Sequence, residues 1–345
     1  MSKRKLSRQQ QWRVDKIQNE RNQRALRQDE QVSEHFAEGQ YCELQLGLIT
    51  AHFGRQVEVE SLEEPRIKQL CHLRAKVDQL VTGDQVSWRP HQEPQGIGVV
   101  EARQERRSLL ARPDMRGVMK AIAANVDQLL LVIAPEPEPF ANLIDRYLVA
   151  AEHTGITPIL LLNKWDLMQE GKMETERQAK VRHLLDVYTQ LGYTLLPTSA
   201  YEETALQALK AQLKDQVSVF VGQSGVGKSS LINALLPGVD LRVGALSADT
   251  RKGRHTTTTA RLFHFAEGGQ LIDSPGIREF SLGFLTPQEI AAGFREFEPY
   301  LGQCRFRDCK HQQDPGCALQ TAVTEGRISA SRFQSYHHLV ASLQS

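Results

Sequence analysis

The chain has 345 residues, of which 40% are hydrophobic and 24% charged, and its formal net charge is +1. This composition is that of an ordinary globular protein, and it excludes wholesale disorder, a collagen-like repeat and a small disulfide scaffold. The longest apolar run, at 129–134, is far shorter than the roughly 18 residues that a membrane-spanning helix needs. We therefore expect a protein of about two domains that has no membrane segment.

The first 36 residues are polar and basic. Residues 1–28 contain nine Lys or Arg and two acidic residues, whereas the rest of the chain carries a net negative charge. We expect a disordered tail that binds a polyanion. The alternatives are a solvated tail that only aids solubility, or a transit peptide, although the segment is rich in Gln rather than Ser. Because it lacks the apolar core of a secretory signal, we expect a cytoplasmic protein with reduced thiols.

Residues 37–112 contain short segments with partial alternation of polar and apolar residues. Turn-forming residues separate them, and they lie at 43–52, 55–60, 66–73, 85–89 and 97–101. Five short strands in such a stretch predict a small barrel or sandwich. Its two cysteines, Cys42 and Cys71, are expected to be ordinary buried thiols.

Residues 113–280 have a different rhythm. Apolar runs or short strand patterns occur at 126–134, 156–162, 193–196 and 217–221, and helical patterns occur at 174–191 and 202–214. Strands that alternate with helices predict a parallel sheet with helices on both faces. After about residue 278 the pattern is mostly helical, with one loop rich in Cys and His.

A phosphate-binding loop follows the strand at 217–221. The motif G-x-x-x-x-G-K-[ST] is matched by Gly222, Gln223, Ser224, Gly225, Val226, Gly227, Lys228 and Ser229, and Ser230 continues into a helical pattern. Glycines let backbone N–H groups close on phosphate oxygens, and the helix adds its positive end. We expect Lys228 to bridge the β- and γ-phosphates and Ser229 to ligate Mg²⁺.

A second motif, N-K-x-D, follows the strand at 156–162. It consists of Asn163, Lys164, Trp165 and Asp166. The Asp166 carboxylate can accept both N–H groups on one edge of guanine, a pairing that adenine does not offer. The segment Thr198-Ser199-Ala200 suits the backbone that meets the guanine carbonyl. The motif alone could be an ordinary turn, but beside a phosphate loop it predicts a GTP or GDP site.

Two further segments are typical of GTPase switches. Asp273-Ser274-Pro275-Gly276 fits D-x-x-G, with an acid near Mg²⁺ and a glycine N–H near the γ-phosphate. Upstream, Thr257 and Thr258 are candidates to ligate Mg²⁺ when the γ-phosphate is present. Ile277 stands where Ras-type GTPases carry a Gln that orients the attacking water. We therefore propose His255 for that catalytic task; the alternative is a solvent-facing His.

The order of these motifs is unusual, because N-K-W-D precedes the phosphate loop. The sequence is therefore that of a circularly permuted GTPase. The permutation need not disturb the site, since all the loops lie at the carboxyl ends of parallel strands.

Three of the five cysteines cluster in the C-terminal loop. Their pattern is C-x4-C-x-H-x5-C, formed by Cys304, Cys309, His311 and Cys317. Three thiolates and an imidazole predict one closed, structural Zn²⁺ site. Unpaired or disulfide-bonded cysteines are the alternative.

Together, these motifs closely resemble the RsgA (YjeQ) family of permuted bacterial GTPases over residues 37–345. The resemblance implies an N-terminal OB-fold β-barrel at 37–112, a circularly permuted P-loop GTPase domain at 113–280 and a helical zinc-binding domain at 281–345, after a basic tail at 1–36. It also implies GTP hydrolysis stimulated by the small ribosomal subunit, and binding to that subunit and its rRNA late in maturation.

Two other functions remain open from the residues. A P-loop metabolic kinase is disfavoured by the guanine-reading motif and the switch segments. An RNA-binding module that uses GTP only as a structural ligand is kept open by Ile277, because water positioning is not assured. We expect a monomer.

Overall fold

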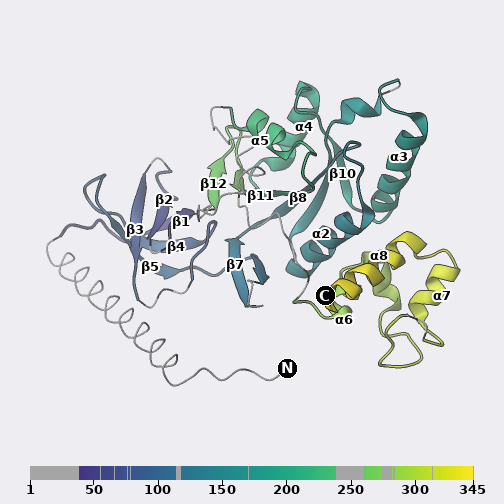
Figure 1. Ribbon diagram of the computed structural model, residues 1–345. Coiled ribbons are helices and arrows are strands. Elements are labelled where there is room, and N and C mark those ends of the chain that lie inside the picture. Colours follow the sequence, from purple (N-terminus) through teal and green to yellow (C-terminus); the bar gives the residue numbers. More distant parts are fainter. Residues whose placement is uncertain are drawn as a thin grey trace, which may run out of the picture. The chain divides into compact units, whose positions relative to one another are not determined.

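The computed structural model describes residues 39–344 apart from 55, 66, 76, 78, 114–117, 170, 238–259, 274–281, 283 and 313 (Figure 1). The predictions for the tail at 1–36 and for His255, Thr257, Thr258, Gly276 and Ile277 therefore lie outside the described residues. The chain divides into two compact units, with the boundary between Arg106 and Arg107.

The first unit is a closed five-stranded, OB-like barrel. Its strands are β1 (Gln45–His52), β2 (Gln56–Ser61), β3 (Lys68–Leu73), β4 (Gln85–Arg89) and β5 (Gly98–Arg103). Their order is β1-β2-β3-β5-β4, and the pairing of β1 with β4 closes the barrel. Alternate residues point inward, so that Ile49, Val57 and Trp88 are fully buried in its core. The predicted small barrel is confirmed. Of its two cysteines, Cys71 is buried as predicted, but the prediction is wrong for Cys42, which is exposed because it precedes the first strand.

The second unit is built on a mostly parallel sheet. Its order is β10 (Thr194–Pro197), β9 (Thr157–Leu162), β8 (Gln128–Ile133), β11 (Val217–Val221), β13 (Gln270–Asp273) and β12 (Arg261–His264), of which only β12 is antiparallel to its neighbour. The predicted alternation of strands and helices is confirmed.

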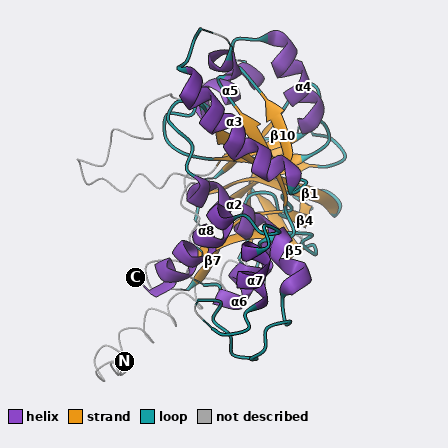
Figure 2. Cartoon of the chain, turned by 90° about the vertical axis from the view of Figure 1, so that its right-hand side faces the viewer, coloured by secondary structure: helices purple, strands orange, loops and turns teal. Residues whose placement is uncertain are grey.

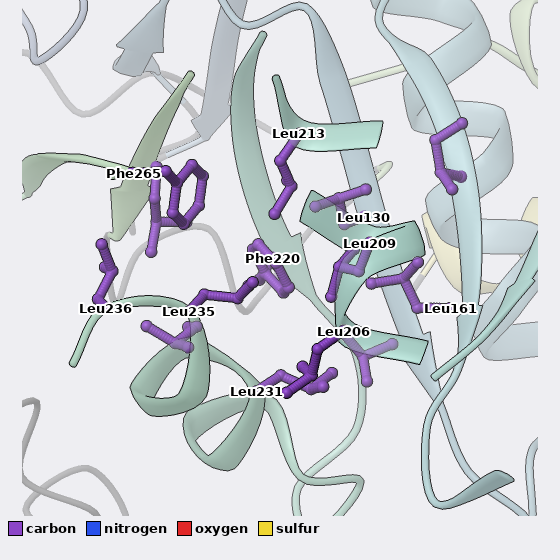
Figure 3. Packing of buried hydrophobic residues seen from close by; sticks show 14 of the residues in the cluster. Leu130, Leu161, Leu206, Leu209, Leu213, Phe220, Leu231, Leu235, Leu236 and Phe265 are labelled. Atoms are coloured by element: carbon purple, nitrogen blue, oxygen red, sulfur yellow. The ribbon is translucent and has the colours of Figure 1, made fainter. Parts of the chain in front are cut away.

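Helices cover both faces of this sheet. Their bounds are α2 Ala141–Thr154, α3 Thr175–Gln190, α4 Glu203–Leu213 and α5 Lys228–Leu235. On one face, Leu209 of α4 and Leu231 of α5 pack on Phe220 of β11 (Figure 3). On the other face, α2 packs on β8 and β9. Because the strands are buried on both faces, they read as unbroken apolar runs.

A hairpin of β6 (Leu109–Pro113) and β7 (Met119–Ala124) precedes this sheet. Residues 107–112 were predicted to lie at the end of the barrel. Instead, β6 pairs with β7 inside the second unit, because its backbone hydrogen bonds are satisfied by the strand that follows it.

The C-terminal part is helical, as predicted. It contains α6 (Pro287–Ala292), the 3₁₀ helix η3 (Arg295–Tyr300), α7 (Ala318–Thr324), α8 (Ala330–Ala341) and η4 (Ser342–Gln344). Helix α8 lies beside α2 of the sheet domain (Figure 2). In the part of the chain that the structure describes, no helix is long and apolar enough to cross a membrane.

Candidate nucleotide site and metal centre

The phosphate loop leaves the carboxyl end of β11 and enters α5 at Lys228. All three of its glycines have backbone angles that only glycine adopts easily, with φ of 134° at Gly222, 84° at Gly225 and 91° at Gly227. A Cβ atom at Gly222 would lie 2.1 Å from the carbonyl oxygen of Val132 on the neighbouring strand. The N-cap residue of α5, Gly227, has no side chain to cap the first turn, which leaves N–H groups there for an anion.

Lys228 lies folded over the phosphate loop. Its Nζ donates to the carbonyl oxygens of Gly222 at 2.7 Å and Gln223 at 2.5 Å. These bonds hold the ammonium group at the mouth of the loop, where phosphate oxygens could replace the carbonyl groups.

The guanine-reading segment follows β9 and is fastened to the phosphate loop. Asn163 is buried; its backbone N–H donates to Ile133 at 2.8 Å and its side-chain Nδ2 donates to the carbonyl oxygen of Val226 at 2.8 Å. Lys164 has a left-handed backbone, and its Nζ donates to the carbonyl oxygens of Glu136 at 2.7 Å and Gly225 at 2.8 Å. The loops after β8, β9 and β11 are thereby joined at one edge of the sheet.

The loop after β10 completes this edge. The hydroxyl of Ser199 donates to Oδ1 of Asp166 at 3.1 Å, and the N–H of Trp165 donates to the carbonyl oxygen of Thr198 at 3.1 Å. One carboxylate oxygen is thus oriented by a buried hydroxyl group. This arrangement leaves acceptor capacity on Asp166 for a ligand, because a carboxylate offers about four lone-pair sites.

A cavity of about 160 Å³ opens between these loops. It is lined by Asn163, Lys164, Asp166, Leu167, Ser199, Ala200, Tyr201, Gly227 and Ser230. Seven of these residues were predicted from the motifs, and Trp165 is not in the lining. Leu167 and Tyr201 were missed, although each directly follows a predicted motif. The volume is below the ~300 Å³ of a typical small-molecule pocket and suits part of a nucleotide.

Two residues predicted to lie near Mg²⁺ are found at the same edge of the sheet. Ser229 stands in the first turn of α5, and Asp273 ends β13, which pairs in parallel with β11. The carboxyl ends of parallel strands lie at the same edge of a sheet, so Asp273 lies near the start of the phosphate loop.

The C-terminal loop gathers the four predicted zinc ligands. One ligand atom from each of Cys304, Cys309, His311 and Cys317 lies within 4.8 Å of the others. Nδ1 of His311 is 3.6 Å from Sγ of Cys304, 3.6 Å from Sγ of Cys309 and 3.4 Å from Sγ of Cys317.

These distances fit a tetrahedral zinc site. With Zn–S of about 2.3 Å and Zn–N of about 2.0–2.1 Å at tetrahedral angles, nitrogen and sulfur ligands are separated by about 3.6 Å. The N–H of Ala318 also donates to Sγ of Cys304 at 3.4 Å, which suits a charged thiolate. Burial raises the pKa of the Cys309 thiol to about 12, so a cation would be needed to keep the sulfur deprotonated.

The comparisons with known proteins agree with this geometry. Residues 103–283 match the family model described as RsgA GTPase. The chain belongs to the RsgA GTPase family. It is 58% identical to a protein of Ectopseudomonas mendocina (strain ymp) named "Small ribosomal subunit biogenesis GTPase RsgA", over 99% of this chain and 98% of that protein. A protein of the same name from Pseudomonas aeruginosa PAO1 is 57% identical over the same shares.

Solved structures are similar to this chain as well. YjeQ from Thermotoga maritima superposes with a TM-score of 0.71 at 34% identity, covering 88% of this chain and 99% of that one. YloQ, described as a circularly permuted GTPase, gives a TM-score of 0.67 at 26% identity, covering 88% and 96%. Membership of the RsgA GTPase family makes this chain a guanine-nucleotide-binding GTPase, and the predicted motif permutation is confirmed.

Proposed function

We propose that this chain hydrolyses GTP to GDP and phosphate while it binds the small ribosomal subunit and its rRNA late in subunit maturation, with stimulation by the subunit. The proposal of GTP binding rests on one observation: Asp166 and Gly227 line a single cavity. The carboxylate that would accept the guanine N–H groups therefore lies beside the phosphate loop. The ribosomal part rests on the names of the full-length relatives. We further propose that the protein acts as a cytoplasmic monomer.

The nucleotide would be held by the motif residues in the following roles. Asp166 accepts the two guanine N–H groups, while Ser199 and Ala200 present backbone to the guanine carbonyl. The backbone N–H groups of 222–228 and the Lys228 ammonium group bind the phosphates. Asn163 holds the loops together through Val226, and Trp165 shapes the turn.

Catalysis would require residues from both switch segments. Ser229 and Asp273 stand where they could hold Mg²⁺, which would neutralise charge on the phosphates. Thr257 or Thr258 would add a ligand, the Gly276 N–H would contact the γ-phosphate, and His255 would orient the attacking water in place of the missing Gln. These four residues remain proposals, because they lie outside the described residues.

The deciding experiment is GTP hydrolysis by the purified chain, alone and with small subunits, large subunits or free RNA. We expect strong stimulation by small subunits alone. We expect His255→Ala to retain GTP binding and lose the stimulated turnover. GTP binding without turnover on any particle would favour a structural use of GTP, and stimulation by none of them would contradict the ribosomal proposal.

We also propose that the C-terminal loop binds one structural zinc ion through its four clustered ligands. The geometry is closed, with no position left for water, so the ion would fold the loop rather than catalyse a reaction. Metal analysis should find one zinc per chain and a large reduction in Cys309→Ser. Equal zinc content in both proteins would contradict the proposal.

A further inference from the structure

Tyr201 is the most exposed large side chain at the edge of the nucleotide cavity. The chain passes from fully buried Thr198 and Ser199 to Tyr201, which is 93% exposed, within three residues. The same tyrosine lines the cavity together with Asp166 and Ala200. Tyr201 belongs to none of the nucleotide-binding motifs, so these motifs do not explain its place beside the cavity.

The backbone of Tyr201 is held firmly in place. Its N–H donates to the hydroxyl of Ser199 at 3.4 Å, and that same hydroxyl donates to Asp166 at 3.1 Å. The next N–H, of Glu202, donates to the carbonyl oxygen of Ser199 at 3.3 Å, immediately before α4 begins. One buried hydroxyl group therefore fixes the tyrosine backbone relative to the carboxylate that would read guanine.

The side chain of Tyr201, unlike its backbone, is not held by a contact with the described residues. Among the residues that the structure describes, it has no hydrogen bond, ring contact or ion pair. A fixed backbone with a free aromatic ring, next to a carboxylate that accepts a purine edge, suits stacking on a base. Stacking of a base on an aromatic side chain contributes substantially to binding and depends little on which base it is.

We propose that the Tyr201 ring stacks on the guanine base held by Asp166 and forms the outer wall of the nucleotide site. The inference rests on the proposed GTP site and adds a binding residue to it. Because the ring would touch only the base, it would contribute equally to GDP and GTP binding. It would not sense the γ-phosphate and would not choose guanine over adenine, a choice that the carboxylate makes.

The test compares Tyr201→Ala and Tyr201→Phe with wild type by titration with fluorescent GDP and with a non-hydrolysable GTP analogue. Loss of the ring should weaken both by about tenfold, the order of one base–aromatic stack. Tyr201→Phe keeps the ring and should bind within about twofold of wild type, since the hydroxyl has no role in a stack. The matched control is Phe306→Ala, which removes another exposed aromatic side chain, far along the chain in the cysteine loop, and should leave both affinities unchanged.

A second variant reports on geometry directly. In Tyr201→Trp, GDP should quench the new fluorescence after subtraction of the wild-type signal, because an indole in contact with a purine base is quenched on stacking. Affinities of Tyr201→Ala equal to wild type, or an unquenched indole while GDP is bound, would overturn the proposal and leave Tyr201 as a surface residue free for a macromolecular partner. Failure of the wild-type chain to bind any guanine nucleotide would instead overturn the proposed function.

Discussion

Gly227 illustrates how one residue can connect two motifs. Its φ is 91°, and a Cβ atom there would lie 2.3 Å from Nδ2 of Asn163. That same Nδ2 donates to the carbonyl oxygen of Val226, so any side chain at 227 would break the bond between the guanine-reading segment and the phosphate loop. Gly155, which ends α2 with a φ of 68°, has nothing within 4 Å of its missing Cβ.

Variants of the two glycines distinguish the effect of backbone strain from that of a steric clash. Both residues have a positive φ, but only Gly227 lacks room for a Cβ atom. We predict that Gly227→Ala weakens GTP binding by more than about tenfold, since the loops that form the site must move apart. Gly155→Ala should leave GTP affinity unchanged and cost about 1 kcal/mol of unfolding free energy, the price of a left-handed alanine. Nucleotide titration and urea unfolding of both variants measure the two effects. Equal GTP affinity in the two variants would show that the contact with Asn163 does not hold the site together.

The loop between β8 and α2 supports the nucleotide site from outside the motifs. Its Glu136 carbonyl oxygen accepts the bond from Lys164. The Glu136 carboxylate is held in turn by Arg177 of α3 at 2.8 Å, and Arg177 also donates to the carbonyl oxygen of Pro135 at 3.4 Å. Helix α3 is thereby linked to Lys164 of the guanine-reading segment through one loop.

We predict that Arg177→Ala weakens the binding of GDP and GTP equally, by about two- to fivefold. This is the size expected for a partly exposed ion pair that only steadies a loop. Lys180→Ala is the control, because it removes an exposed i,i+4 pair with Glu176 from the same helix. We expect faster nucleotide release, measured by displacement of fluorescent GDP, in Arg177→Ala alone. Identical release rates in the two variants would contradict the link.

The elements of the sheet domain are largely predictable because each one has a local signature. Buried parallel strands appear as apolar runs, and Gly222 or Asp166 belongs to a motif that fixes its place at a strand end. The contact of Lys164 with Glu136 has no such signature, because the acceptor is a backbone carbonyl group. The pairing of β6 with β7 was missed for a related reason: two short strands that pair with each other, beside the larger sheet, have no motif that marks them.

One buried arginine connects the C-terminal helices to the sheet domain. Arg332 of α8 is 2% exposed and forms a bond with the fully buried Asp145 of α2. It also donates hydrogen bonds to both carboxylate oxygens of Glu296 in η3, at 2.6 and 3.0 Å, and its guanidinium group lies over the ring of Phe294. The sequence could not indicate this, because an arginine on an amphipathic helix reads as solvent-exposed.

We predict that Arg332→Met lowers the unfolding free energy by about 3–5 kcal/mol, because two buried carboxylates lose their cation. Arg327→Met is the control. Its guanidinium group contacts Glu325 and Tyr300, but its side chain is 63% exposed, so the change should stay within about 0.5 kcal/mol. Urea unfolding followed by circular dichroism measures both. A loss below about 1 kcal/mol in Arg332→Met would mean that the carboxylates are solvated and that other contacts fasten the C-terminal part.

The same helix connects the proposed metal centre to the sheet domain. Tyr336, one turn after Arg332 on α8, lies with its ring centroid 6.2 Å from that of His311, one of the proposed zinc ligands. Folding of the cysteine loop and docking of α8 on α2 should therefore stabilise each other. We predict that Cys309→Ser and Arg332→Met are not additive: the double variant should lose less stability than the two single losses combined, by more than about 0.5 kcal/mol. Once the arginine is gone, loss of the metal can no longer weaken the contact between α8 and α2. Additive losses, measured by urea unfolding of all four proteins, would mean that the metal centre and the sheet domain are stabilised independently.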